Sequence, residues 1–146
     1  MNLLAEYIVD WLRDYGVEVI RDKAKILLPT PRVNRAVARI VKERTIKTIA
    51  FGAAAPLGWM SSTLRKAGAE RIVALTHGHE VWWAKVFPFN LMMRRIGSTT
   101  DSLTYLGEFT RTAISKALTT KSAAAMQKIA PGIDIEHFRA VDATAL

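Results

Sequence analysis

The order of strand-like and helix-like segments constrains the fold of this chain more than any other feature. Three short segments rich in β-branched and apolar residues, 48–51, 71–76 and 102–106, are each followed by a segment with helical periodicity. Strands separated by helices in this way form βαβ units, whose consecutive strands run parallel. The pattern predicts an α/β domain with a mainly parallel sheet and helices on both faces.

Other expected elements extend this pattern towards both ends. Helices are expected over residues 31–44, 56–67, 91–96, 108–118 and 121–126, and short strands over residues 17–20 and 127–130. Residues 3–15 carry leucine, isoleucine, tryptophan and tyrosine at helical spacing, and Gly16 follows as a helix-ending residue. We expect this first helix to pack on the sheet, because its apolar stripe would otherwise form a large exposed patch.

Length and composition suit one domain with a hydrophobic core. The chain has 146 residues, half of them hydrophobic, and we assign residues 1–138 to one domain and residues 139–146 to a tail. Its lack of cysteine excludes disulfides, thiolate metal sites and cysteine nucleophiles. Because it has only three histidines, a three-histidine metal site would need all of them, and we predict no metal.

No targeting or membrane-spanning segment is predicted. Acidic residues interrupt the apolar run at the start of the chain, and no basic region precedes that run, so it is unlike a signal peptide. The longest uncharged stretch, 49–64, is too short to span a bilayer and is interrupted by Gly52, Pro56 and Gly58. We expect a cytoplasmic protein that is soluble or bound peripherally to a membrane.

Positive charge is concentrated in one part of the chain. The net charge is +8, and residues 21–47 carry nine basic side chains against two acidic ones. Four of them form a narrow stripe on the helix expected at 31–44: Arg32, Arg35, Arg39 and Lys42. Such a helix can bind an anionic membrane surface, and nucleic acid is another partner that fits the net charge. A solvated outer face explains the stripe equally well, so the sequence leaves these alternatives open.

A histidine-rich turn follows the most apolar expected strand. It reads Thr76-His77-Gly78-His79-Glu80, and ligands of parallel sheets bind beyond the carboxyl ends of the strands. Imidazole can hydrogen-bond a sugar hydroxyl or a phosphate, or act as an acid or base. The alternative is a turn whose histidines only hydrogen-bond locally, and position and composition favour the functional interpretation.

Two neighbouring segments are more ambiguous. Small residues from Gly52 to Gly58 follow another expected strand and would let a helix amino terminus approach an anion, but close packing of helix on sheet is the favoured interpretation. The aromatic run at 82–89 lies beside the histidine turn. It can line an acceptor pocket, stack on a sugar, contact lipid, or form a small apolar cluster under a loop.

Taken in order, several of these segments resemble one enzyme family. They are FGAAAPL at 51–57, THGHEV at 76–81, LTY at 103–105 and PGID at 131–134, followed by Phe138. This order resembles the amino-terminal domain of family 4 retaining glycosyltransferases with the GT-B fold, above all the GDP-mannose-dependent phosphatidylinositol mannoside mannosyltransferases. The resemblance covers about residues 17–138 and implies a Rossmann-like domain, one half of a GT-B fold.

The resemblance also implies partners and roles. The donor substrate would be GDP-mannose, the acceptor an anionic phosphatidylinositol mannoside glycolipid, and neither a cofactor nor a metal would be needed. His77 would contact the transferred sugar and stabilise the developing oxocarbenium ion. The implied substrate-binding residues are Gly52, Ala53, Gly78, His79, Glu80 and Tyr105. The basic stripe would hold the protein peripherally at the inner face of the cell membrane.

The chain also departs from the family pattern. Members begin with a strand and a glycine-rich phosphate-binding loop, whereas a helix is expected here at 1–16, and they carry a second, nucleotide-binding domain. We therefore expect a truncated member or fragment that is inactive alone, unless a partner chain supplies the nucleotide-binding half. The alternative is a non-catalytic basic α/β module that binds anionic membrane or nucleic acid, which explains the charge but not the histidine turn.

Overall fold

A computed structural model of the protein describes residues 28–129 and Gly132. Its centre is a sheet of four parallel strands in the order β1-β2-β3-β4. The strands are β1 (Thr48–Phe51), β2 (Arg71–Ala74), β3 (Ser102–Tyr105) and β4 (Gln127–Lys128). The predicted α/β domain with a parallel sheet is therefore confirmed.

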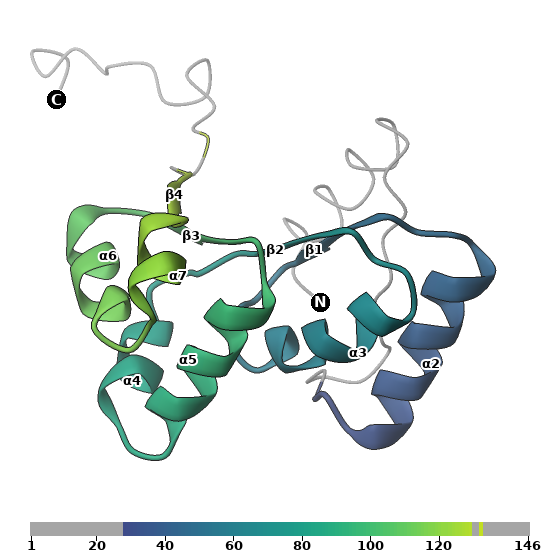
Figure 1. The fold of residues 1–146 in the computed structure, drawn as a ribbon. Helices are drawn as coiled ribbons and strands as arrows, with labels where there is room; N and C mark the ends of the chain where they lie inside the picture. The colour runs from purple at the N-terminus through teal and green to yellow at the C-terminus, as the bar shows by residue number, and fades with distance from the viewer. Residues whose placement is uncertain (1–27, 130–131, 133–146) are drawn as a thin grey trace, which may run out of the picture.

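Helices connect these strands (Figure 1). They are α2 (Pro31–Glu43), the 3-10 helix η1 (Leu57–Met60), α3 (Ser61–Lys66), α4 (Glu80–Lys85), α5 (Phe89–Thr99), α6 (Glu108–Ser115) and α7 (Thr120–Ala124). Each new strand adds on the same side of the previous one, and right-handed crossovers then place the connecting helices on one face. Figure 1 shows α2, α3, α4 and α5 along one side of the strands.

Most expected elements recur, with some differences. The single helix expected at 56–67 is instead the 3-10 helix η1 followed by α3. Helix α4 was not expected, since valine and two tryptophans at 81–83 have modest helix propensity, and its packing against α5 and α6 overrides that preference. Helix α5 is longer than the 91–96 expected. The expected helix at 3–15, the strand at 17–20 and most of the segment after 130 lie outside the described residues. Helices on the second face of the sheet stay a prediction.

The core forms where the sheet meets its helices. From the strands, Ile72, Ala74 and Leu103 are fully or almost fully buried. From α3, α5 and α6 the buried partners are Leu64, Met93, Ile96 and Ile114. Burying a side chain of this size contributes about 1.5–3 kcal/mol, so these contacts hold the sheet and its helices together.

One carboxylate links two strands and a helix at the amino ends of the strands. Asp101 accepts a hydrogen bond from the Ile72 N–H at 2.7 Å and forms an ion pair with Arg65 Nη2 at 2.6 Å. Partial burial raises the pKa of Asp101, but the Ile72 hydrogen bond and the Arg65 guanidinium outweigh it and lower that pKa below its usual value. Asp101 therefore connects the start of β3 to strand β2 and to helix α3.

Helix α2 begins at a side-chain cap and packs by its apolar face. Thr30 accepts a hydrogen bond from the Val33 N–H at 3.3 Å, and Pro31 occupies the first turn. Asn34 Nδ2 donates to Thr63 Oγ1 at 3.1 Å, which ties α2 to α3. Among the described helices, none combines the length and apolar character that crossing a bilayer requires.

The contact of η1 with α5 gives a test of this packing. A Cβ added to the buried Gly58 would lie 2.6 Å from Cγ2 of the fully buried Ile96. We expect Gly58→Ala to lower the free energy of unfolding by about 1–3 kcal/mol, because a crowded core must shift. Urea denaturation measures this. Gly52→Ala is the control, since a Cβ there meets nothing within 4 Å; equal losses would contradict the packing.

Candidate functional site

The carboxyl ends of the first three strands are tied together. The Ala54 N–H donates to the Leu75 carbonyl at 2.7 Å, which joins the loop after β1 to the end of β2. Thr76 Oγ1 donates to the Thr104 carbonyl at 2.7 Å, and the Thr76 N–H donates to Thr104 Oγ1 at 3.3 Å. Since Thr76 is buried, these bonds fix the point where the histidine turn begins.

His77 bridges two of these loops. Its Nε2 lies 2.5 Å from the Gly52 carbonyl oxygen, and His77 is exposed just beyond the carboxyl end of β2. A carbonyl only accepts, so Nε2 carries the proton and, in the neutral ring, Nδ1 is left as an acceptor. Two predicted site residues from different loops therefore lie side by side, with one ring nitrogen directed away from the contact.

Gly78 gives the turn its shape. Its φ of +97° is a conformation that side-chain-bearing residues rarely adopt. Its carbonyl accepts a hydrogen bond from the Val81 N–H at 3.2 Å, at the start of α4. The glycine therefore lets the chain pass from β2 into α4 over a few residues.

Glu80 is buried beneath the turn. Its side chain is 0% exposed, and Oε2 accepts a hydrogen bond from the His77 N–H at 2.9 Å. Oε1 makes no hydrogen bond within the described part of the chain and lies 3.4 Å from His79 Nε2. A carboxylate without solvent contact acts on the backbone that it binds, so its predicted contact with substrate stays a prediction and its evident role is to hold the turn.

His79 presents its ring beside that of His77. The two rings are nearly parallel, at 8°, with centroids 6.4 Å apart, and the His79 side chain is 56% exposed. Gly52 is exposed and Ala53 half-buried, which leaves room for a ligand to approach the loop backbone. The structure therefore gathers His77, His79, Gly52 and their neighbours in one exposed place.

Tyr105 ends the next strand but lies deeper. Its side chain is 9% exposed, and the Arg111 guanidinium lies 5.8 Å from its ring centroid. Its carbonyl accepts a hydrogen bond from the Ile129 N–H at 3.0 Å, which extends the ladder towards β4. These contacts describe a packed residue, and its substrate-binding role stays a prediction.

The predicted basic stripe is exposed on α2. Arg32, Arg35, Arg39 and Lys42 are all exposed, whereas Val41 on the opposite face is buried. Arg39 pairs with Glu43 at 3.8 Å, and both side chains are more than 60% exposed (74% and 64%), so this pair contributes little. The stripe presents its charge to the surroundings and not to the core.

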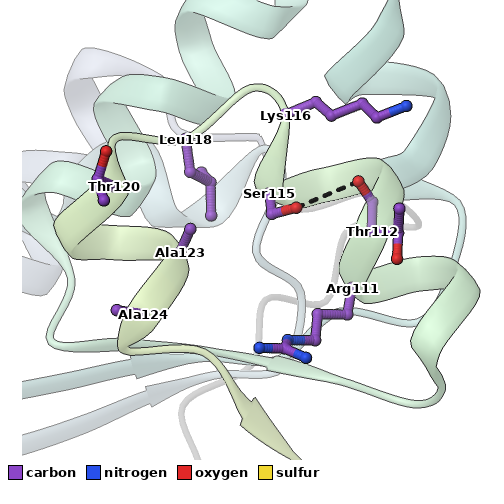
Figure 2. A pocket seen from close by; sticks show the side chains of 8 residues that line it. All are labelled: Arg111, Thr112, Ser115, Lys116, Leu118, Thr120, Ala123 and Ala124. Atoms are coloured by element: carbon purple, nitrogen blue, oxygen red, sulfur yellow. Dashed lines mark hydrogen bonds between the residues drawn. The ribbon is translucent and has the colours of Figure 1, made fainter.

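A hollow that the sequence did not predict lies between α6 and α7 (Figure 2). Its volume is about 520 Å³, and Arg111, Thr112, Ser115 and Lys116 line one wall. Ser115 Oγ donates to the Thr112 carbonyl at 3.1 Å, so that hydroxyl is engaged within its own helix. The residues that line it come from α6, α7 and the segment between them, and include none of the histidine turn.

No metal-ligand cluster is found within residues 28–129. There, no group of three or more histidine or acidic side chains is arranged to hold an ion. His137 lies outside the described residues. The chemistry that the described site offers is that of two imidazoles, backbone carbonyls and a buried carboxylate.

No protein-family model matches the chain. Its sequence is 38% identical, over 130 residues, to the GDP-mannose-dependent alpha-(1-6)-phosphatidylinositol monomannoside mannosyltransferase of Mycobacterium tuberculosis, covering 89% of this chain and 33% of the relative. It is 39% identical over 123 residues to the protein of that name from Mycolicibacterium smegmatis, covering 84% and 32%. A GDP-mannose-dependent monoacylated alpha-(1-6)-phosphatidylinositol monomannoside mannosyltransferase of Corynebacterium glutamicum is 39% identical over 121 residues, covering 83% and 31%.

The chain spans about one third of the length of these relatives. Identity at this level over most of the chain, together with a parallel α/β sheet, confirms the predicted resemblance. Over nearly nine tenths of its length, this chain is a homologue of part of the phosphatidylinositol mannoside mannosyltransferases, within the glycosyltransferases.

Proposed function

We propose that this chain forms the acceptor-side half of a cleft that transfers mannose from GDP-mannose to a phosphatidylinositol mannoside-type glycolipid. The observation that carries the proposal is the exposed His77, held against the Gly52 carbonyl at the carboxyl end of β2. The homology supports the choice of donor and acceptor, since relatives that match most of this chain are named for them.

His77 would act on the transferred sugar through Nδ1. Because Nε2 donates to the Gly52 carbonyl, Nδ1 can accept a hydrogen bond from a mannose hydroxyl. The Nδ1 lone pair of His77 and the dipole of the Gly52 carbonyl would stabilise the positive charge that develops on the sugar. Because both groups are already held in place, they would not need to reorganise during the reaction. Gly52 and Ala53 would allow the sugar close to the backbone, and His79 would border the same space.

The other side of the cleft would come from the part of such an enzyme that this chain does not match. The matched region is about one third of each relative. The resemblance implies that groups gripping the nucleotide lie in the nucleotide-binding half, so we expect no mannose transfer by this chain by itself. A partner chain that supplies this half is a second way to complete the cleft.

The basic stripe of α2 would place the cleft at its lipid acceptor. Four exposed cations on one face attract an anionic bilayer, each by about 1 kcal/mol near the surface. We propose a peripheral location at the inner face of the cell membrane. The competing function is a non-catalytic basic module that binds membrane or nucleic acid, favoured by the same stripe. Comparison of binding to phosphatidylinositol vesicles and to RNA over a salt series separates a lipid partner from a nucleic-acid partner.

A hybrid enzyme tests the proposed activity. This chain replaces the matched third of the Mycobacterium tuberculosis relative, and mannose transfer from GDP-mannose is measured. We expect turnover by the hybrid, and a loss of about 10²- to 10³-fold in its His77→Ala form, as for other preorganised groups at developing charge. His79→Ala is the matched control, with a smaller loss expected. A folded hybrid without turnover would contradict the function, and an equal loss at His79 would move the sugar contact there.

Two Glu80 variants test how the turn is held. Glu80→Ala leaves the His77 N–H without its acceptor, and we expect the free energy of unfolding to fall by about 1–3 kcal/mol. Glu80→Gln keeps an oxygen that can accept this hydrogen bond, so its free energy of unfolding should fall less. Urea unfolding gives both values, and hydrogen exchange at the His77 amide should speed up in the alanine variant. Unchanged exchange in that variant would mean that the carboxylate does not hold the turn.

Charge reversal tests the stripe. Changing Arg32, Arg35, Arg39 and Lys42 to Glu should strongly reduce sedimentation with phosphatidylinositol vesicles at low salt and leave the circular dichroism spectrum intact, since these side chains are exposed. The matched control reverses four exposed lysines elsewhere, with the same change in net charge: Lys66, Lys116, Lys121 and Lys128. Equal losses in both variants would show that net charge, and not the stripe, attracts the bilayer.

A further inference from the structure

The helices that follow the histidine turn expose large apolar side chains. Phe87 and Phe109 are each 74% exposed, Leu91 is 55% and Trp82 is 53% exposed. We name these four side chains the aromatic patch. Isolated exposed apolar residues are normal on soluble proteins, but adjoining ones mark a surface that another apolar phase covers.

The members of the aromatic patch are linked through α4. The Trp82 and Phe89 rings lie 5.1 Å apart, and Phe89 follows Phe87 directly across Pro88. Lys85 lies one helical turn after Trp82, and its Nζ is 5.9 Å from the Phe109 ring centroid. Leu91 lies one turn beyond Phe87. The patch therefore comes from α4, the turn before α5 and the start of α6, and α4 packs against both α5 and α6.

Cations border this surface, and its central segment carries no acid. Residues 81–100 contain Lys85, Arg94 and Arg95 and no aspartate or glutamate. The Arg95 guanidinium lies 4.9 Å from the ring centroid of Trp59, which is 40% exposed. Of the two acidic residues in α4 and α6, Glu80 is buried, and Glu108 lies 3.3 Å from Arg111 Nη1. Positive charge around exposed aromatics complements an anionic lipid surface.

We propose that the aromatic patch is a second membrane-contact surface, whose side chains enter the headgroup region of an anionic bilayer. Tryptophan and phenylalanine are suited to that depth, with lysine and arginine reaching the lipid phosphates. The proposal rests on the proposed function only for the presence of a lipid acceptor. In Figure 1, α4 and α5 lie on the same side of the strands as α2.

The two surfaces differ in their response to salt. Attraction by the α2 stripe is screened within about 8 Å at physiological salt, so it weakens steeply as salt rises. Apolar side chains that leave water keep their contribution at high salt. A variant of the patch should therefore lose vesicle affinity at every salt concentration, whereas the stripe variant should lose it chiefly at low salt.

The experiment uses the full 146-residue chain and sedimentation with vesicles of phosphatidylcholine containing either phosphatidylinositol or phosphatidylglycerol. The test variant is Phe87→Ser with Leu91→Ser. We expect its partition coefficient to fall about tenfold on both vesicles, at low and at high salt. The matched control is Leu28→Ser with Ile129→Ser, two equally exposed apolar residues outside the patch (52% and 50%), and its affinity should not change.

Three outcomes overturn the proposal. Equal affinity of the test variant and the unchanged chain means that the patch does not enter the bilayer. If the unchanged chain is dimeric by sedimentation velocity and the test variant is a monomer with unchanged vesicle binding, a second copy covers the patch. If the same two substitutions in the hybrid enzyme lower its melting temperature and leave vesicle binding unchanged, the rest of that enzyme covers the aromatic patch. If the test variant loses affinity for phosphatidylglycerol vesicles tenfold but the hybrid enzyme transfers no mannose, the membrane-contact surface is supported and the proposed transfer is contradicted.

Discussion

The site depends on the hydrogen bonds that hold the carboxyl end of β2 between its neighbours. Leu75 accepts from the loop after β1, and Thr76 bonds twice to Thr104 of β3. Parallel pairing alone brings the carboxyl ends of the strands to the same end of the sheet. These hydrogen bonds also fix the position from which the residues after Thr76 leave the sheet. His77 consequently meets the Gly52 carbonyl, and two loops that are distant in sequence form one surface.

A buried carboxylate completes this arrangement from below. Burying a charged group costs free energy unless hydrogen bonds replace its water, and Glu80 receives one from the His77 N–H. Its second oxygen faces His79 at 3.4 Å, a distance that a shift of either side chain can close. The turn therefore couples both histidines to one buried group. A change at Glu80 is therefore expected to act on the His77 backbone and on the surroundings of the His79 ring, even though the carboxylate does not reach the surface.

Much of the fold could be predicted from the sequence, because the strands and α2 carry strong local signals. Thr30 and Pro31 start α2, and apolar periodicity gives its inner face, so the exposed stripe followed from spacing alone. Helix α4 gave no such signal, since Trp82 and Trp83 read as a loop until packing against α5 and α6 is known. The burial of Glu80 and the hollow beside Arg111 depend on contacts between distant elements, which spacing cannot supply.

In the proposed membrane attachment, the charged and apolar surfaces would act in two physical steps. The α2 stripe would attract the bilayer over several ångströms and orient the domain before contact, but salt screening would limit how strongly it binds. The aromatic patch acts only on contact, through apolar area removed from water. Since Glu80 opens α4 and Trp82 follows two residues later, the patch and the histidine turn share one short helix. A bilayer that anchors Trp82 would therefore also fix the distance between lipid surface and His77, which is what a lipid-linked acceptor requires of the sugar site.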